Sequence, residues 1–136
     1  MYKVHQVPQH RVQQTWDAVE DYIASALKYS GGEYTIEQAR LLTGLGAWKL
    51  FIAVDDENVV HGACTVQFNP MPNDMVAFVT AIGGKYISDK DIWGRLVKLF
   101  KDNGATEVQG AVREASARWL KHLGFTEKYK IVGVKI

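Results

Sequence analysis

Two adjacent glycines, Gly83 and Gly84, lead into a segment whose residue types could hold a phosphate group. An apolar run precedes them, and Ser88 with Asp91 has the form of a capped helix start. A strand that passes through glycines into a helix exposes unpaired backbone N–H groups at the positive end of the helix dipole, which suits phosphate or pyrophosphate. Lys85 could add a positive charge. The alternative is that the two glycines, with no fixed motif around them, only turn the chain.

The other reactive side chains form no recognisable catalytic or metal-binding pattern. The single cysteine, Cys64, lies in an apolar run, and we expect a buried hydrophobic residue rather than a nucleophile. No G-x-S-x-G elbow, Walker-type lysine loop or dinucleotide glycine fingerprint is present. The histidines are scattered, so we expect no metal site; they are His5, His10, His61 and His122. The residues alone identify no catalytic group.

Length and composition narrow the class of protein. The chain has 136 residues, of which 47% are hydrophobic and 23% charged, and its formal net charge is +1. This length suits a single domain over residues 1–136. The charge balance argues against a nucleic-acid partner, and one cysteine permits no internal disulfide. No apolar run approaches the ~20 residues that span a bilayer, and the first residues do not resemble a signal peptide. We therefore expect a cytoplasmic protein with no membrane partner.

Hydrophobic periodicity predicts alternating strands and helices. Apolar residues three and four apart, with a capping box at Thr35 and Gln38, predict helices over residues 12 to about 30, 36–44, about 89–103 and 114–123. Gly124 should end the last helix in the left-handed conformation. Short apolar or alternating runs predict strands over residues 2–7, 48–54, 59–68, 75–82, 106–112 and 125–136. Two prolines place residues 69–74 in a loop.

The elements predict an α/β fold with a mixed sheet. Their order is β-α-α-β-β-β-α-β-α-β, with three consecutive antiparallel strands in the middle. The run at residues 75–82 is apolar on both faces, so it should form a central strand that is covered on both sides. The tryptophans should lie at core-facing or boundary positions; they are Trp16, Trp48, Trp93 and Trp119.

This order resembles the GNAT family of acyl-CoA-dependent N-acyltransferases over nearly the whole chain. The strongest local match is R-E-A-S-A-R-W-L-K-H-L-G-F at residues 113–125, which is similar to the family's last helix and the Leu-Gly-Phe that follows it. Residues 30–35 and 48–54 are similar to GNAT-like proteins of tailed phages and prophages. The resemblance implies an N-acyltransferase that moves an acetyl or other acyl group from acetyl-CoA to an amine of a small molecule or a protein.

The resemblance also implies where the ligands would lie. The acyl-CoA would lie between the strands at residues 75–82 and 106–112. Contacts to the acceptor would come from Glu33 and Tyr34, for which the alternatives are a solvated loop residue and a hydrophobic staple before the helix. The pyrophosphate would contact backbone amides of one continuous segment, which consists of Ile82, Gly83, Gly84, Lys85, Tyr86, Ile87 and Ser88.

The sequence departs from the family where the chemistry is expected. The family's pyrophosphate loop reads Gln/Arg-x-x-Gly-x-Gly/Ala, and residues 82–87 lack the leading Gln or Arg. Arg113 stands where the family usually has Asn, and Leu120 stands where it usually has the Tyr that protonates the departing thiolate. The loss of such an acid can cost about 10²–10⁴ in rate. The alternative function is therefore a catalytically inactive GNAT-like binding or structural module, of phage or prophage origin.

Exposed sheet edges offer one further expectation. Strand edges near residues 59–68 or 130–136 could pair between two copies and give a homodimer.

Overall fold

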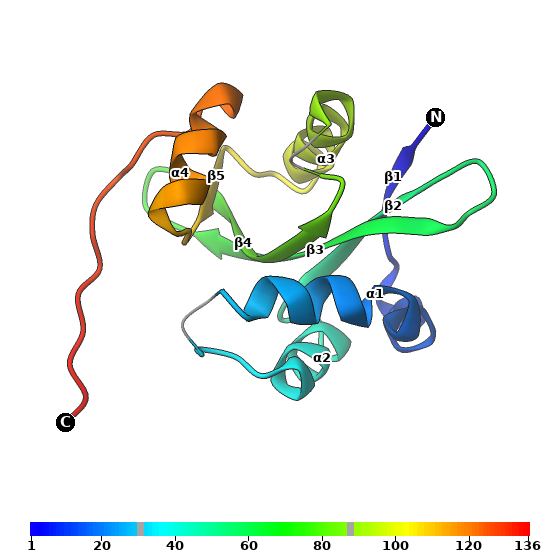
Figure 1. Cartoon of the computed structure of the whole chain (residues 1–136), viewed down its shortest axis with the longest axis horizontal. Coiled ribbons are helices and arrows are strands. Elements are labelled where there is room, and N and C mark those ends of the chain that lie inside the picture. The colour runs from blue at the N-terminus through cyan, green and yellow to red at the C-terminus, as the bar shows by residue number, and fades with distance from the viewer. Residues whose placement is uncertain (30–31, 87–88) are drawn as a thin grey trace.

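One sheet of five strands organises the chain, in the order β1-β2-β3-β4-β5 (Figure 1). The computed structural model describes residues 1–29, 32–86 and 89–136. The pairs β1–β2, β2–β3 and β3–β4 are antiparallel, and the pair β4–β5 is parallel. The predicted mixed sheet with three central antiparallel strands is therefore confirmed. The strands are β1 (Lys3–Gln6), β2 (Lys49–Val54), β3 (Val60–Pro70), β4 (Met75–Gly84) and β5 (Glu107–Gly110).

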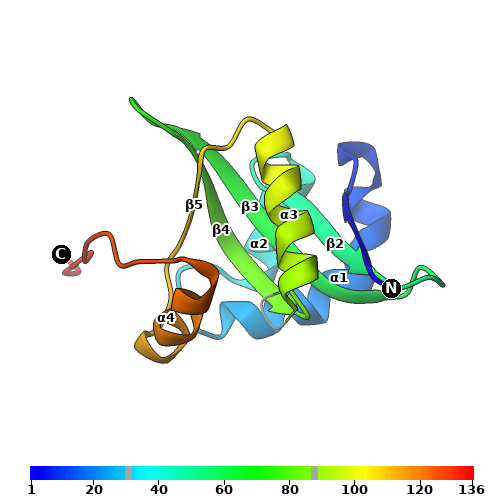
Figure 2. The same cartoon turned by 90° about the horizontal axis from the view of Figure 1, so that it is seen from above.

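Helices cover both faces of this sheet. Helices α1 and α2 lie on one face, α3 lies on the other, and α4 stands beside β5 (Figures 1 and 2). Among the described residues, no helix is both long enough and apolar enough to cross a membrane. The helices are α1 (Val12–Leu27), α2 (Ile36–Gly44), α3 (Lys90–Asp102) and α4 (Glu114–Leu120), with 3₁₀ turns at Gln9–Arg11 and Lys121–Leu123.

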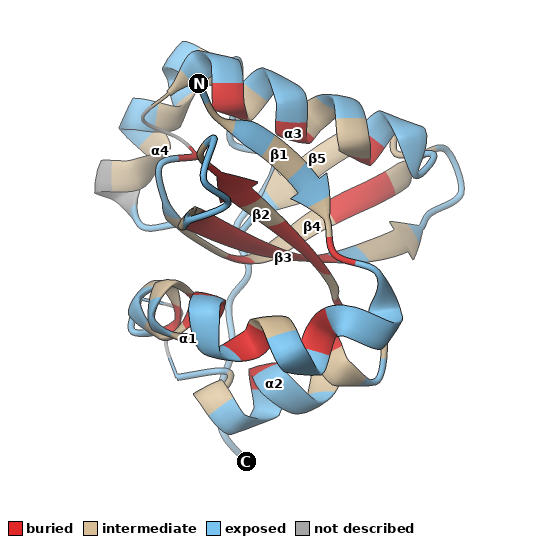
Figure 3. Ribbon diagram, turned by 90° about the vertical axis from the view of Figure 1, so that its right-hand side faces the viewer, coloured by how far each residue is buried: buried red, intermediate tan, exposed pale blue. Residues whose placement is uncertain are grey.

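The alternation of side chains along the strands divides the core into two apolar layers. In β2, Leu50 packs under α1 and the next residue, Phe51, packs under α3. The predicted faces of α1 and α3 are buried in these layers, with Trp16 at the centre of one and Phe100 in the other. Figure 3 shows the buried parts of β2 and β3 between the two helical layers.

Two of the predicted helix ends are confirmed and one is changed. The N–H of Gln38 donates to Thr35 Oγ1 (3.1 Å), and the N–H of Thr35 donates to Gln38 Oε1 (2.9 Å), so the capping box is present. Gly124 is left-handed (φ +91°) after the 3₁₀ turn that extends α4. Asp89 caps helix α3, and the predicted cap residue Ser88 lies outside the described residues.

Strand ends differ from the prediction at the two turns. Strand β3 runs to Pro70, which pairs with Met75, because a proline at the end of a ladder removes only one donor. Strand β4 continues through Gly83 and Gly84, which lie opposite Ala63 and Gly62. Gly83 therefore lies within the strand, whereas Gly84 is its last residue and is left-handed (φ +86°), so the alternative that both glycines only turn the chain is wrong for Gly83.

The predicted strand at residues 125–136 is also wrong. These residues form no helix or strand. Phe125 packs against Trp93 and Lys128 pairs with Glu107, and the rest of the segment runs away from the domain (Figure 1). No neighbouring strand of the described chain pairs with it, and strand propensity alone does not hold a strand in water. The predicted edge at residues 59–68 is wrong because β3 lies between β2 and β4; the edge strands are β1 and β5. Trp119 is 43% exposed, against the prediction of a core or boundary position.

The closeness of β4 to α1 gives a first prediction. A Cβ at Gly83 would lie 2.5 Å from the backbone oxygen of Tyr22, so Gly83→Ala should lower the free energy of unfolding by about 1–3 kcal/mol. The matched control is Gly94→Ala in α3, where a Cβ would meet no atom within 4 Å. It should raise stability by about 0.5–1 kcal/mol through helix propensity. Urea denaturation of both variants measures the difference, and equal midpoints would contradict this packing.

Candidate functional site

An extra residue in β4 bends the sheet at its centre. Thr65 of β3 lies opposite Ala81, whereas the next residue, Val66, lies opposite Val79, so Thr80 is bulged out of the ladder. The Thr80 hydroxyl donates to the backbone oxygen of Thr65 (3.0 Å), and the two hydroxyl oxygens are 2.8 Å apart. These contacts satisfy polar groups inside the sheet and fix the position of the bulge.

Strands β4 and β5 separate just after this bulge. They pair only from Val76–Glu107 to Val79–Gly110, although β4 continues to Gly84. From Thr80 onward, the side of β4 that faces β5 therefore has no strand partner in the described chain. A cleft of about 190 Å³ opens between the two strands.

The cleft is mainly apolar and is built from both helical layers. Its walls are residues 79–82 of β4 and residues 109–113, and it is closed by residues of α1, α3 and α4 and by Phe125. The Arg113 guanidinium lies over the Tyr29 ring, 4.1 Å from its centroid. The lining residues whose side chains contain polar atoms are Tyr29, Thr80, Trp93, Gln109, Arg113 and Ser116.

The lining lacks the groups that most often move protons. No Asp, Glu or His among the described residues lines the cleft. Leu120 lines it, so an apolar side chain occupies the position for which the resemblance implies an acid. Tyr29 at the end of α1 supplies a phenol from a different element. No motif or periodicity points to Tyr29, because it is 59% exposed and only the tertiary fold brings it to the cleft.

The segment predicted to bind pyrophosphate is only partly at the cleft. Ile82 lines it, whereas Gly84 packs against the backbone of His61. The Lys85 ammonium lies 5.4 Å from the centroid of the Tyr2 ring. The Tyr86 side chain is fully buried in the α3-side core, where burial raises the pKa of its phenol. The predicted contacts at Ile87 and Ser88 lie outside the described residues.

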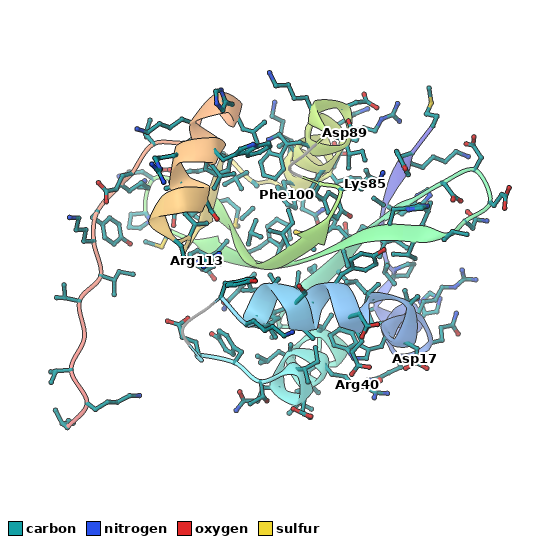
Figure 4. The ribbon with its side chains drawn as sticks, in the orientation of Figure 1. Asp17, Arg40, Lys85, Asp89, Phe100 and Arg113 are labelled. Carbon is teal, nitrogen blue, oxygen red and sulfur yellow. The ribbon has the colours of Figure 1, made fainter. Side chains whose placement is uncertain are left out.

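The Asp89 carboxylate already occupies N–H groups at the start of α3. The N–H groups of Asp91 (2.9 Å) and Ile92 (3.2 Å) both donate to one carboxylate oxygen of Asp89. Asp91 is itself paired with Arg95, Oδ2 to Nε at 3.1 Å. Figure 4 shows Lys85 and Asp89 at this end of α3, well away from Arg113 at the start of α4. A phosphate at these N–H groups would have to compete with the Asp89 carboxylate.

The two residues predicted on the acceptor side lie elsewhere. Tyr34 is half-buried and packs edge-on against Trp48, with ring centroids 4.9 Å apart. Glu33 is exposed, and neither residue lines the cleft. A role in acceptor binding therefore stays a prediction for both.

Two other reactive groups lie outside the cleft. Cys64 is fully buried, and burial raises the pKa of its thiol, which agrees with the predicted structural role. His61 Nε2 lies 2.8 Å from Asp55 Oδ2, and this hydrogen bond lowers the pKa of the Asp55 carboxyl. No group of three or more potential metal ligands occurs in the described parts of the chain.

Comparison with known proteins identifies the fold. No protein family model matches the sequence, and no curated protein matches it. Among solved structures, AAC(6')-Iy in complex with the bisubstrate analogue CoA-S-monomethyl-acetylneamine has a TM-score of 0.67 and 15% identity, over 100% of this chain and 98% of that chain.

Two other acetyltransferase structures are similar along their whole length. A ribosomal-protein-alanine N-acetyltransferase from Brucella melitensis biovar Abortus 2308 has a TM-score of 0.68 and 12% identity, over 100% of this chain and 99% of that chain. An aminoglycoside acetyltransferase from an uncultured soil metagenomic sample has a TM-score of 0.69 and 13% identity, with the same coverage. Five strands in this order and these overlaps establish that the chain has the fold of the GNAT acetyltransferases.

Proposed function

We propose that this chain is a GNAT-type N-acyltransferase that transfers an acetyl or other acyl group from acyl-CoA to the amine of a small molecule or a protein in the cytoplasm. The observation that carries this proposal is the cleft between β4 and β5. The cleft is apolar, lies beside unpaired backbone of β4, and occurs in a fold whose solved examples include acetyltransferases. One of those neighbours was solved with a CoA-containing bisubstrate analogue.

The cleft suits one half of an acyl-CoA better than the other. The apolar walls of the cleft suit the acylated arm of acyl-CoA, and the unpaired edge of β4 suits the amide groups of that arm. The diphosphate half of acyl-CoA would compete with the Asp89 carboxylate for the N–H groups at the start of α3. It has to displace this carboxylate or bind beside it. Lys85 and Lys90 are the cations nearest to this cap in the sequence, and Arg113 lies in the cleft wall.

The chain's residues divide the work of acyl transfer as follows. Bound acyl-CoA supplies an activated thioester. A backbone N–H of β4 beyond the bulge, in the region of Ile82 and Gly83, polarises the thioester carbonyl. The cleft walls orient the reacting groups. Because no described carboxylate or histidine lines the cleft, the amine loses its proton to solvent water, and the Tyr29 hydroxyl donates a proton to the departing thiolate.

The competition between the Asp89 carboxylate and a diphosphate at the start of α3 gives a binding prediction. We expect Asp89→Ser to bind CoA and acetyl-CoA about tenfold more tightly than the unaltered protein, because serine keeps a capping oxygen and removes a negative charge close to the diphosphate. Isothermal titration calorimetry measures this ratio. The matched control is Asp102→Ser, which removes the same charge from the far end of α3 and should leave the affinity unchanged. An absence of binding by both unaltered protein and Asp89→Ser would refute the proposal.

The proton donor gives a kinetic prediction. Tyr29→Phe should lower the rate of CoA thiol release with a panel of amines by about 10²-fold or more, with little change in KM. Leu120→Tyr should raise the rate, because it places a phenol in the cleft on α4. Trp119→Tyr serves as the control, since that neighbouring residue does not line the cleft. A Tyr29→Phe enzyme with unchanged turnover would remove Tyr29 from the mechanism.

Two observations favour a second candidate, a catalytically inactive GNAT-like binding or structural module, for which a phage or prophage origin stays a prediction. Leu120 occupies the cleft position for which the resemblance implies an acid, and Asp89 occupies N–H groups at the start of α3. This candidate predicts that neither the unaltered protein nor Asp89→Ser binds CoA in the calorimetric titration. The same titration therefore separates the two functions.

A further inference from the structure

Arg113 brings a positive charge to the candidate cleft. Of the lining residues that the structure describes, it alone carries a formal charge at neutral pH, since no aspartate, glutamate, histidine or lysine lies among them. Beside apolar walls a charge acts more strongly than it does in open water. The cleft therefore favours a ligand with an anionic group and disfavours an amine that brings further positive charges.

An aromatic ring, and not an acid, contacts the Arg113 guanidinium. The guanidinium lies over the Tyr29 ring, 4.1 Å from its centroid. Within the described part of the chain, no carboxylate forms an ion pair with Arg113. A guanidinium has five N–H donors in a planar fork, and a carboxylate can accept two of them at once. The ring contact therefore positions Arg113 and leaves donors for a carboxylate.

Arg113 lies close to the proposed reacting groups and far from the proposed diphosphate position. Figure 4 shows it at the start of α4, well away from Lys85 and Asp89 at the start of α3. Its contact Tyr29 is the residue whose hydroxyl we assign to the departing thiolate. An anion that binds Arg113 is thus close to the thioester, and it is not the diphosphate of CoA.

A carboxylate at this position could belong to the acceptor or to the acyl group. The walls of the cleft around Arg113 are mainly apolar, and they suit an uncharged acyl group. Arg113 itself is exposed, so a separate molecule can reach it from solvent. Both observations favour the acceptor as the source of the carboxylate.

We propose that the acceptor is an amine that carries a carboxylate close to its nitrogen, as a free amino acid does, and that Arg113 binds this carboxylate. The inference rests on the proposed acyl transfer. The amine nitrogen attacks the thioester carbonyl carbon, so a C–N bond forms and the C–S bond breaks. The amine loses one proton to water, and the thiolate takes the proton of the Tyr29 hydroxyl, which water restores. The product is an N-acyl amino acid whose carboxylate is unchanged.

The test compares amino acids with their own amides as acceptors. Each amide keeps the amine and the side chain and removes the negative charge. With acetyl-CoA as donor, kcat/KM for CoA release should be about tenfold or more higher for the acid of the preferred pair. Arg113→Gln should bring this ratio to about one, whereas Arg113→Lys should keep part of it, because lysine keeps the charge and loses the planar fork. A general loss of activity does not change a ratio measured within one variant.

Arg118→Gln is the matched control. Arg118 lies on α4, is exposed and does not line the cleft. The substitution removes the same charge from the same helix, so the ratio of acid to amide should stay that of the unaltered protein. An equal loss of the ratio in both variants would overturn the role of Arg113.

Product binding supplies a readout that needs no turnover. In the presence of CoA, N-acetyl amino acids should bind the unaltered protein more tightly than their amides in an NMR titration. Arg113→Gln should abolish this difference. If the protein binds CoA and binds the acids and amides equally, the inference is overturned even where no acceptor reacts.

The outcomes separate this inference from the proposed function. Transfer to acids and amides with equal kcat/KM leaves the acyltransferase in place and overturns the carboxylate site. A preference for succinyl-CoA over butyryl-CoA that Arg113→Gln removes would move the carboxylate to the acyl group, and it would also overturn the inference. A protein that binds neither CoA nor N-acetyl amino acids would refute both proposals.

Discussion

The cleft depends on a single inserted residue. If β3 and β4 kept one register throughout, β4 would stay straight beyond Val79 and β5 could follow it to its end. The bulge at Thr80 bends β4 there, and the strands separate. A bulge in a buried sheet leaves polar groups that need partners. The Thr80 hydroxyl supplies one, because it donates to the Thr65 carbonyl oxygen at 3.0 Å, and the Thr65 and Thr80 hydroxyl oxygens lie 2.8 Å apart. Two threonines thus stabilise the geometry on which any ligand site here relies.

The parts of the fold that depend on local pattern could be predicted from the sequence. The buried faces of α1 and α3, the Thr35 capping box and the three antiparallel strands all follow from residue spacing within one element or one hairpin. The extent of β4 could not be predicted in this way. Gly83 stays in the strand because it packs against Tyr22 of α1, about sixty residues earlier in the chain. The bulge also leaves no periodic signal, since it shifts the register by one residue only.

The candidate site also contains residues that a local pattern predicts and residues that only the tertiary fold brings there. The family resemblance implied a ligand between the two strands that form the cleft, and the motif at residues 113–125 placed Leu120 at the family's acid position; Leu120 does line the cleft. It did not find Tyr29, which approaches from α1. The pattern of residues 125–136 predicts a strand, and the pattern is indeed that of a strand. Whether such a segment is a strand depends on a partner edge, which its own sequence does not specify.

Under the proposed function, the Asp89 carboxylate at the start of α3 would influence how a CoA-like ligand binds. A capping carboxylate contributes about 1 kcal/mol through its N–H contacts, and it is held in place by the chain at no cost in translational entropy. A free diphosphate would have to replace the Asp89 carboxylate at the same N–H groups. It would also be repelled by the charges of Asp89 and Asp91. The diphosphate alone would therefore bind weakly at this position. Affinity has to come from the apolar cleft and from the unpaired edge of β4, so the length and polarity of the arm that enters the cleft would govern which ligand this protein accepts.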